Sequence, residues 1–212
     1  MRTMTASATD NQGSFQTSVT LLSALRDMRD HASWQHFHTL YRPMLIAVSI
    51  RSGLSEQDAH DLVQDAIIEV AKEMPTFRYD RTRGRFKGWL LTIVRRRIAN
   101  FWRSKHYRHN GEQVPREQLV EPSNLDAGAE LGSDFDRVWD EEWRQHALRV
   151  AEDHVKHEVE PVQFQAFQLH VVKGVAAGET ARRLGIKLME VYWAKYRIGR
   201  LMKKAIAEAD GF

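Results

Sequence analysis

The sequence of 212 residues predicts an all-α protein made of two small helical domains. Apolar residues recur with the spacing of a helix face along most of the chain, and no sustained period-two alternation marks a strand. One stretch, "HNGEQVPREQLVEPSNLDAGAELGS", is rich in turn-forming residues and poor in apolar ones, so it divides the chain. We therefore expect a disordered tail over 1–17, a helical domain over 18–108, a flexible acidic linker over 109–133 and a second helical domain over 134–208.

The first domain begins with two expected helices, from about Ser18 to Asp30 and from Trp34 to Arg51. Pro43 lies inside the second helix and is expected to bend it, because proline lacks the backbone N–H that the helix needs. Gly53 follows closely and marks the end of that helix.

The third helix has the clearest boundaries. Ser55 is a typical N-cap with Asp58 three residues later, and Pro75 stops the helix after Met74. At about 100° per residue, one face is apolar; it contains Ala59, Leu62, Val63, Ala66, Ile67, Val70 and Met74. The opposite face carries Asp61, Gln64, Asp65 and Lys72 around Ile68. An exposed apolar residue rimmed by acids is typical of a protein-docking surface, although a single exposed isoleucine is also ordinary.

A fourth helix is expected from Phe86 to about Tyr107. Its apolar arc contains Phe86, Leu90, Ile93, Val94, Ile98 and Phe101, and its opposed basic arc includes Arg95, Arg96 and Arg103. Arg97 falls on the apolar side, where it would need an acidic partner.

Cations and aromatic rings are concentrated around this fourth helix. Residues 78–108 hold eleven Lys or Arg residues and one acid, a net charge of +10, and seven aromatic residues lie between Phe77 and Tyr107. Core packing explains the rings but not the cations, and a solvated charge run explains the cations but not the rings. Single-stranded nucleic acid uses both, because bases stack on rings while phosphates meet cations.

The charge pattern then alternates along the chain. Residues 110–142 hold ten acids and two arginines, net −8, and residues 173–204 hold nine cations and two acids, net +7. Two basic blocks around an acidic one indicate two contacts with a polyanion, whereas two solvated helical faces are the alternative.

The C-terminal stretch "GETARRLGIKLMEVYWAKYRIGRLMKK" predicts a helix-turn-helix. It holds a short helix from Gly178 to Leu184, a turn at Gly185 and a longer basic helix. Such a unit places its second helix in the major groove. Base-edge candidates are Lys187, Met189, Glu190, Tyr192 and Trp193, and phosphate candidates are Lys195, Arg197 and Arg200. A plain helical hairpin would show the same pattern.

Other classes of protein receive little support. Without cysteine there is no disulfide or thiolate metal site. No apolar run predicts a membrane span, and the N-terminus lacks the apolar segment of a secretory signal, so we expect a cytoplasmic protein. Neither "HASWQHFH" nor the pair His154 and His157 has a complementary ligand set, so we expect no metal and no cofactor. No P-loop, nucleophile elbow or paired-carboxylate arrangement indicates an enzyme.

Two segments together resemble bacterial RNA polymerase sigma factors of the extracytoplasmic-function (ECF) type. "DAHDLVQDAIIEVAKEMPTFRYDRTRGRFKGWLLTIVRRRIANFWR" is similar to region two, most closely at 61–65, the 77–86 loop, 88–90 and 93–95. "ETARRLGI" and "VYWAKYRIGRLMK" are similar to region four, and the segment from Phe135 to Leu169 fits the helices that precede it. Two departures stand out: Arg96 occupies a position where the family often has Asn, and Lys187-Leu188 replaces the usual Ser or Thr cap.

The resemblance implies a sigma factor that binds core RNA polymerase and promoter DNA, both as duplex and as melted strand, with an anti-sigma protein as a further partner. It assigns polymerase binding to Asp61, Gln64, Asp65 and Ile68. It assigns capture and melting of the −10 element to Phe77, Tyr79, Arg85, Phe86, Trp89, Arg95, Arg96, Asn100 and Arg103. It assigns reading of the −35 element to Arg182, Lys187, Glu190, Tyr192, Trp193, Lys195, Arg197 and Arg200. The alternatives are a two-domain helix-turn-helix regulator that acts without polymerase and, more remotely, a metal-dependent nuclease.

Overall fold

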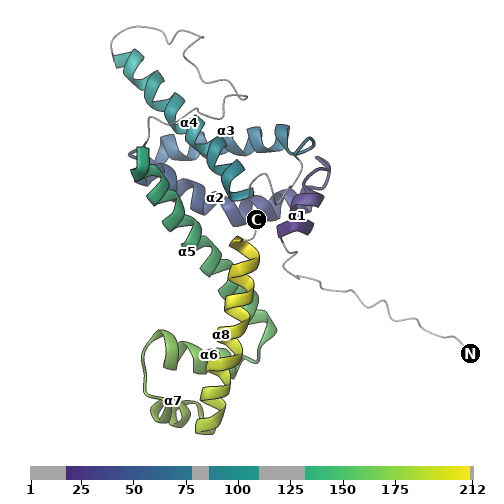
Figure 1. Ribbon diagram of the computed structural model, residues 1–212, viewed down its shortest axis with the longest axis vertical. Helices are drawn as coiled ribbons and strands as arrows, with labels where there is room; N and C mark the ends of the chain where they lie inside the picture. The colour runs from purple at the N-terminus through teal and green to yellow at the C-terminus, as the bar shows by residue number, and fades with distance from the viewer. Residues whose placement is uncertain (1–17, 78–85, 110–131, 211–212) are drawn as a thin grey trace, which may run out of the picture.

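A computed structural model describes residues 18–77, 86–109 and 132–210 of the chain (Figure 1). Within these ranges the protein is built from helices and short connections, with no strand, so the all-α prediction is confirmed. The predicted tail and most of the predicted linker lie outside the described residues, and so do Tyr79 and Arg85.

Four helices form the first group: α1 (Ser18–Ala24), α2 (His31–Arg51), α3 (Glu56–Glu73) and α4 (Phe86–His109). The first expected helix is shorter than predicted, and the second begins earlier, because the Asp30 side chain caps α2 by accepting from the Ser33 N–H at 3.1 Å. Helix α2 continues through Pro43. It ends at Arg51, and Gly53 two residues later has a φ of 91°, in the region that favours glycine.

Helix α3 has the predicted cap and the predicted buried face. The Asp58 N–H donates to the Ser55 hydroxyl at 3.2 Å, and that hydroxyl donates to the Asp58 carboxylate at 2.6 Å. Every residue of the predicted apolar face is buried except Ile67, which is half-buried. This face packs on α2 and α4, and its side chains join Phe37, Leu45 and Leu90 in the first hydrophobic core.

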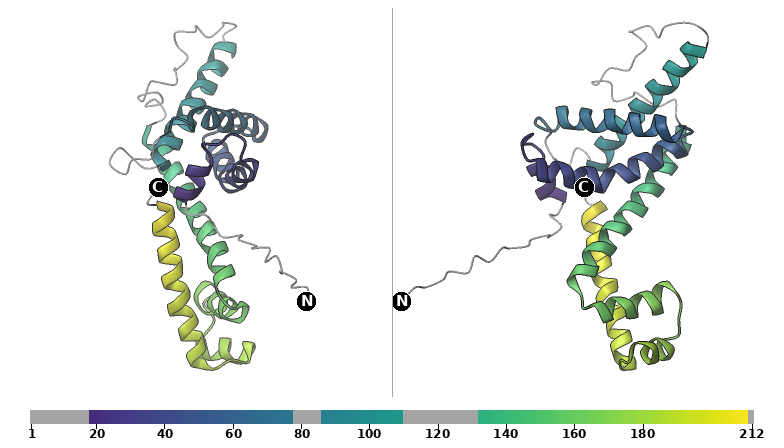
Figure 2. Two further views of the ribbon diagram at one scale, coloured as in Figure 1. Left: turned by 90° about the vertical axis from the view of Figure 1, so that its right-hand side faces the viewer. Right: turned by 180° about the vertical axis from the view of Figure 1, so that it is seen from behind.

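The second group contains α5 (Gly132–Glu158), α6 (Pro161–Phe167), a π-helical turn η3 (Gln168–Val172), α7 (Ala177–Leu184) and α8 (Leu188–Asp210). Helix α8 runs antiparallel beside the second half of α5 (Figures 1 and 2). Helices α6 and α7 pack against the first half of α8. A second hydrophobic core lies between these helices, around Val155, Ala166 and Ile198.

Helix α5 connects the two groups. Phe135, Trp139 and Trp143 recur every four residues on one face of its first half, and all three are buried in the first core, against α2. The Trp143 ring lies 6.0 Å from the Tyr41 ring, while Val155 in the second half of α5 belongs to the second core. The packing therefore differs from the predicted division at residue 134, because aromatic burial joins the start of α5 to the first domain.

None of the helices in the described part of the chain is both long and apolar enough to cross a membrane.

Candidate nucleic-acid and protein interfaces

The face of α3 that points away from the core has the composition predicted from the sequence. Asp61, Gln64 and Asp65 are exposed, and Ile68 lies among them with 45% of its surface exposed. The Arg97 guanidinium from α4 approaches Asp65 at 3.6 Å. The surface is thus an apolar centre with an acidic rim, held on a rigid and well-capped helix.

A buried carboxylate joins α3 to α4. Glu69 is 8% exposed and pairs with both Arg96 and Arg97, accepting from the Arg97 Nε at 2.5 Å. Arg97 thus has the acidic partner that its place on the apolar side required.

The same contacts correct the prediction for Arg96. This residue is 3% exposed, so it does not lie on an open basic arc. It is covered where α3 packs on α4, and Glu73 lies 3.5 Å away as a second acid. Burial lowers the pKa of Arg96 and raises the pKa of Glu73. Arg96 therefore links α4 to α3 through ion pairs.

An aromatic cluster lies where α3 ends and α4 begins. Phe77 and Trp89 are half-buried, and their ring centroids are 4.4 Å apart. Phe86 is completely buried beneath them, 5.5 Å from the Trp89 ring and 6.3 Å from the Phe37 ring. Phe86 therefore lies in the core, where its position on the apolar arc places it, and not on the surface that the predicted DNA contact requires.

Arg95 and Arg103, further along α4, also have intramolecular partners. The Arg95 guanidinium pairs with Asp136 of α5 and lies 5.4 Å from the centroid of the Phe135 ring, and burial lowers its pKa. The Arg103 guanidinium donates to the Asn100 side-chain oxygen at 3.3 Å. The described part of the basic block is thus partly covered by α5.

The predicted helix-turn-helix is present in α7 and α8. Gly185 ends α7 in the left-handed conformation, with φ 65° and ψ 29°, as its place in the sequence predicted. The Ile186 N–H donates back to the Ala181 carbonyl at 3.1 Å, and Ala181 and Val191 are buried between the two helices.

The residues predicted to read the −35 element are all exposed on this unit, namely Arg182, Lys187, Glu190, Tyr192, Trp193, Lys195, Arg197 and Arg200. Some of them already have partners. The Glu190 carboxylate accepts from the Lys187 N–H at 2.6 Å, which supplies a cap where Lys187-Leu188 replaces Ser or Thr. Arg182 pairs with Glu179 at 2.5 Å.

Residues 37–108 match the family model described as Sigma-70 region 2. This match spans most of α2 and all of α3 with the connection to α4, and it ends one residue before α4 does. The chain therefore contains a sigma-70 region 2 over these residues. A region 2 supports a role in promoter recognition, with DNA and RNA polymerase as partners in transcription initiation. A comparison with curated proteins finds no match for the chain.

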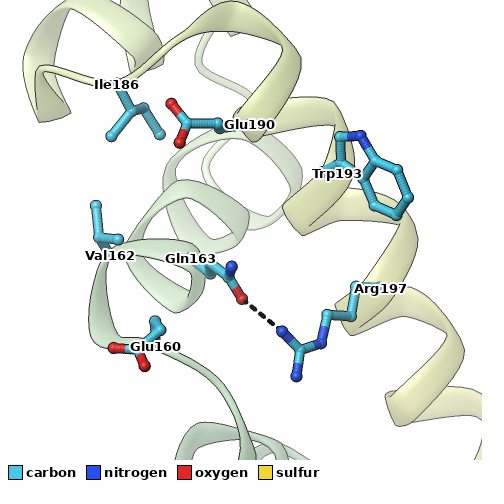
Figure 3. A pocket seen from close by; sticks show the side chains of 7 residues that line it. All are labelled: Glu160, Val162, Gln163, Ile186, Glu190, Trp193 and Arg197. Atoms are coloured by element: carbon cyan, nitrogen blue, oxygen red, sulfur yellow. Dashed lines mark hydrogen bonds between the residues drawn. The ribbon is translucent and has the colours of Figure 1, made fainter.

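The C-terminal half of the chain also carries a pocket of about 390 Å³ between the start of α6 and the first turns of α8 (Figure 3). Val162, Ile186 and Trp193 supply its apolar lining, and the Arg197 guanidinium donates to the Gln163 side-chain oxygen at 3.2 Å across it. Trp193 is 65% exposed, so it does not pack into the core.

Sequence reasoning missed three residues that organise region 2. Glu69 comes seven residues after Leu62, so helical periodicity alone puts its carboxylate on the buried face of α3. That position, read together with Arg97 on the apolar side of α4, is a signal that could have revealed the pair. The other two, Asp136 and Asp140, belong to the acidic block, and no local signal places them against α4.

Within the described ranges, no three His, Cys, Asp or Glu side chains gather in a way that could hold a metal ion.

Proposed function

We propose that this protein is an ECF-type sigma factor that binds core RNA polymerase through α3, captures and melts the −10 element beside α4, and reads the −35 element with α8. The observation that carries the proposal is the exposed α3 face within a matched sigma-70 region 2. A regulator that acts on DNA alone has no need for an apolar centre with an acidic rim on this face.

The docking step uses Asp61, Gln64, Asp65 and Ile68. Burial of the exposed Ile68 side chain under a partner lowers the free energy of the complex. The acids around Ile68 favour a partner with a basic surface. Asp65 also lies near Arg97, so the rim acid closest to α4 is already oriented by an ion pair.

Strand capture uses aromatic rings and polar side chains that lie on both sides of the connection between α3 and α4. Extruding a base costs a few kcal/mol, and each base–aromatic stack returns roughly 1–3 kcal/mol. Phe77 and Trp89 form a half-buried pair suited to such stacking. Arg95, Asn100 and Arg103 supply polar contacts, and Tyr79 and Arg85 complete the proposed set. Phe86 and Arg96 serve as buried supports.

Reading of the −35 element rests on the helix-turn-helix. Helix α8 presents Lys195, Arg197 and Arg200 for phosphates, and Tyr192 and Trp193 are exposed near its start. Apolar groups there can contact the methyl groups of thymine.

The docking assignment is tested with Asp61→Ala combined with Gln64→Ala. We expect this double variant to lose affinity for core RNA polymerase, measured by fluorescence anisotropy of labelled protein, and to keep its affinity for random duplex DNA. The control removes the same two side-chain types from exposed positions on α5 and α6, with Asp153→Ala and Gln165→Ala.

Equal loss of polymerase and duplex binding in the α3 variant would show that these residues are structural. Strong duplex binding by the unmodified chain without any affinity for polymerase would refute the sigma factor proposal and leave the regulator that acts without polymerase.

A further inference from the structure

The first half of α5 places its acids against the cations of the region 2 domain. Asp140 pairs with Lys87 at 2.7 Å and Asp136 pairs with Arg95, so these two cations of α4 face α5 carboxylates. The next two residues of α5 are also paired: Arg51 at the end of α2 contacts Glu141 at 2.7 Å and Glu142 at 2.8 Å.

These ion pairs form an ordered strip. Residue numbers rise from Lys87 to Arg95 along α4 while they fall from Asp140 to Asp136 along α5, so the two helices run in opposite directions at the contact. The spacing of four residues on α5 puts both acids on one side of that helix. The strip therefore follows from helix geometry and does not depend on a single side chain.

Aromatic residues of α5 hold this strip in place. Phe135, Trp139 and Trp143 are buried in the core, which fixes the position of the acids between them. The same rings contact the cations, with the Lys87 ammonium 5.7 Å from the Trp143 centroid and the Arg95 guanidinium over Phe135. Lys87 and Arg95 thus each meet a carboxylate and a ring, which is the pair of contacts that single-stranded nucleic acid offers as phosphate and base.

The second half of α5 lacks this arrangement. Two of its acids pair within the helix itself, Asp153 with His157 and Glu158 with His154. The acids that reach another element's cations are therefore concentrated in the half that lies beside α4.

We propose that the first half of α5 is an intramolecular competitor of nucleic acid, which occupies Lys87 and Arg95 until a melted strand displaces its carboxylates. Lys87 becomes a strand-binding residue in addition to those named above. The inference rests on the proposed function, because it takes the α4 face as the strand-binding surface. In the isolated chain, strand binding is weak because phosphates must replace carboxylates that are already in place.

The test neutralises the competitor without removing the aromatic residues that dock it. Asp136→Asn with Asp140→Asn is compared with Asp153→Asn and Glu158→Gln, which remove two negative charges from the second half of the same helix. The probe is a fluorescein-labelled single-stranded oligonucleotide of roughly 16 nucleotides. Its affinity for the full chain is measured by anisotropy at several salt concentrations.

We expect the first double variant to bind on the order of tenfold more tightly than the unmodified chain at low salt, since two more cations reach phosphates. The slope of log affinity against log salt should steepen by about 1.4, or about 0.7 for each added phosphate contact on a single strand. The control should stay near the unmodified chain in both measurements.

Equal affinity and equal slope in the two double variants would overturn the competitor while leaving strand capture intact. If no protein, including the unmodified chain, binds the oligonucleotide even at low salt, then strand capture and the competitor are refuted together.

A second experiment uses the absence of cysteine from the chain. Lys87→Cys with Asp140→Cys allows α5 to be linked to α4 by a bis-maleimide reagent that carries a disulfide in its spacer. We expect linking to weaken binding of the same oligonucleotide, and reduction of the spacer to restore it. Unchanged affinity after complete linking would overturn the inference.

Discussion

Neutralising Glu69 tests how the α3 and α4 pair is held. The substitution Glu69→Gln leaves Arg96, which is 3% exposed, without its main counter-charge. Breaking a buried ion pair by removing one partner costs about 3–5 kcal/mol. We expect about 3 kcal/mol, at the lower end, because Arg96 retains Glu73 at 3.5 Å and the partly exposed Arg97 retains Asp65 at 3.6 Å.

The measurement is the free energy of unfolding of the full chain in urea, followed by far-ultraviolet circular dichroism. Glu73→Gln is the matched control, since its side chain is one-third exposed and its neutralisation should cost under about 1 kcal/mol. Adding Arg96→Met to Glu69→Gln should recover about 1–2 kcal/mol, because the unpaired charge is then gone. If Glu69→Gln costs no more than Glu73→Gln, the buried carboxylate does not hold the helices together and the reasoning fails.

Three further predictions follow from other sites. Burial lowers the pKa of His146 to about 4, below the value near 6.5 in an unfolded chain. The free energy of unfolding should therefore be unaffected by this histidine above pH 6.5 and fall by up to about 3 kcal/mol towards pH 4. His146→Phe should remove that part of the pH dependence of the urea midpoint. Gly185→Ala should destabilise by about 1 kcal/mol, because its φ is 65°, whereas Gly199→Ala inside α8, where an added Cβ meets nothing within 4 Å, should stabilise by about as much, both measured by thermal unfolding. Trp89→Ala should reduce transcription from a duplex promoter more than from a premelted one, and equal loss on both templates would contradict its role in opening.

Local patterns in the sequence were sufficient to predict the main helices and several of their ends. The Ser55 cap, the left-handed Gly185 and the exposed Ile68 opposite a buried apolar face were all predicted and are all present. Each depends on residues within one or two helical turns, where backbone geometry fixes which groups meet.

Which helix faces are covered was decided by the tertiary structure. Periodicity put Arg96 opposite the apolar arc, yet α3 covers it and Glu69 neutralises it. The sequence placed Asp136 and Asp140 in an acidic block at the start of the second domain, yet they lie against α4 because Trp139 and Trp143 are buried beside α2.

The sequence by itself therefore determined the all-α class, the capped α3 with its exposed acidic face and the helix-turn-helix. Only the tertiary structure decided that two arginines share one buried carboxylate and that α5 acids pair with Lys87 and Arg95 of α4. The physical reason is that helical periodicity relates residues along one helix, whereas burial of a charge depends on which distant segment packs over it.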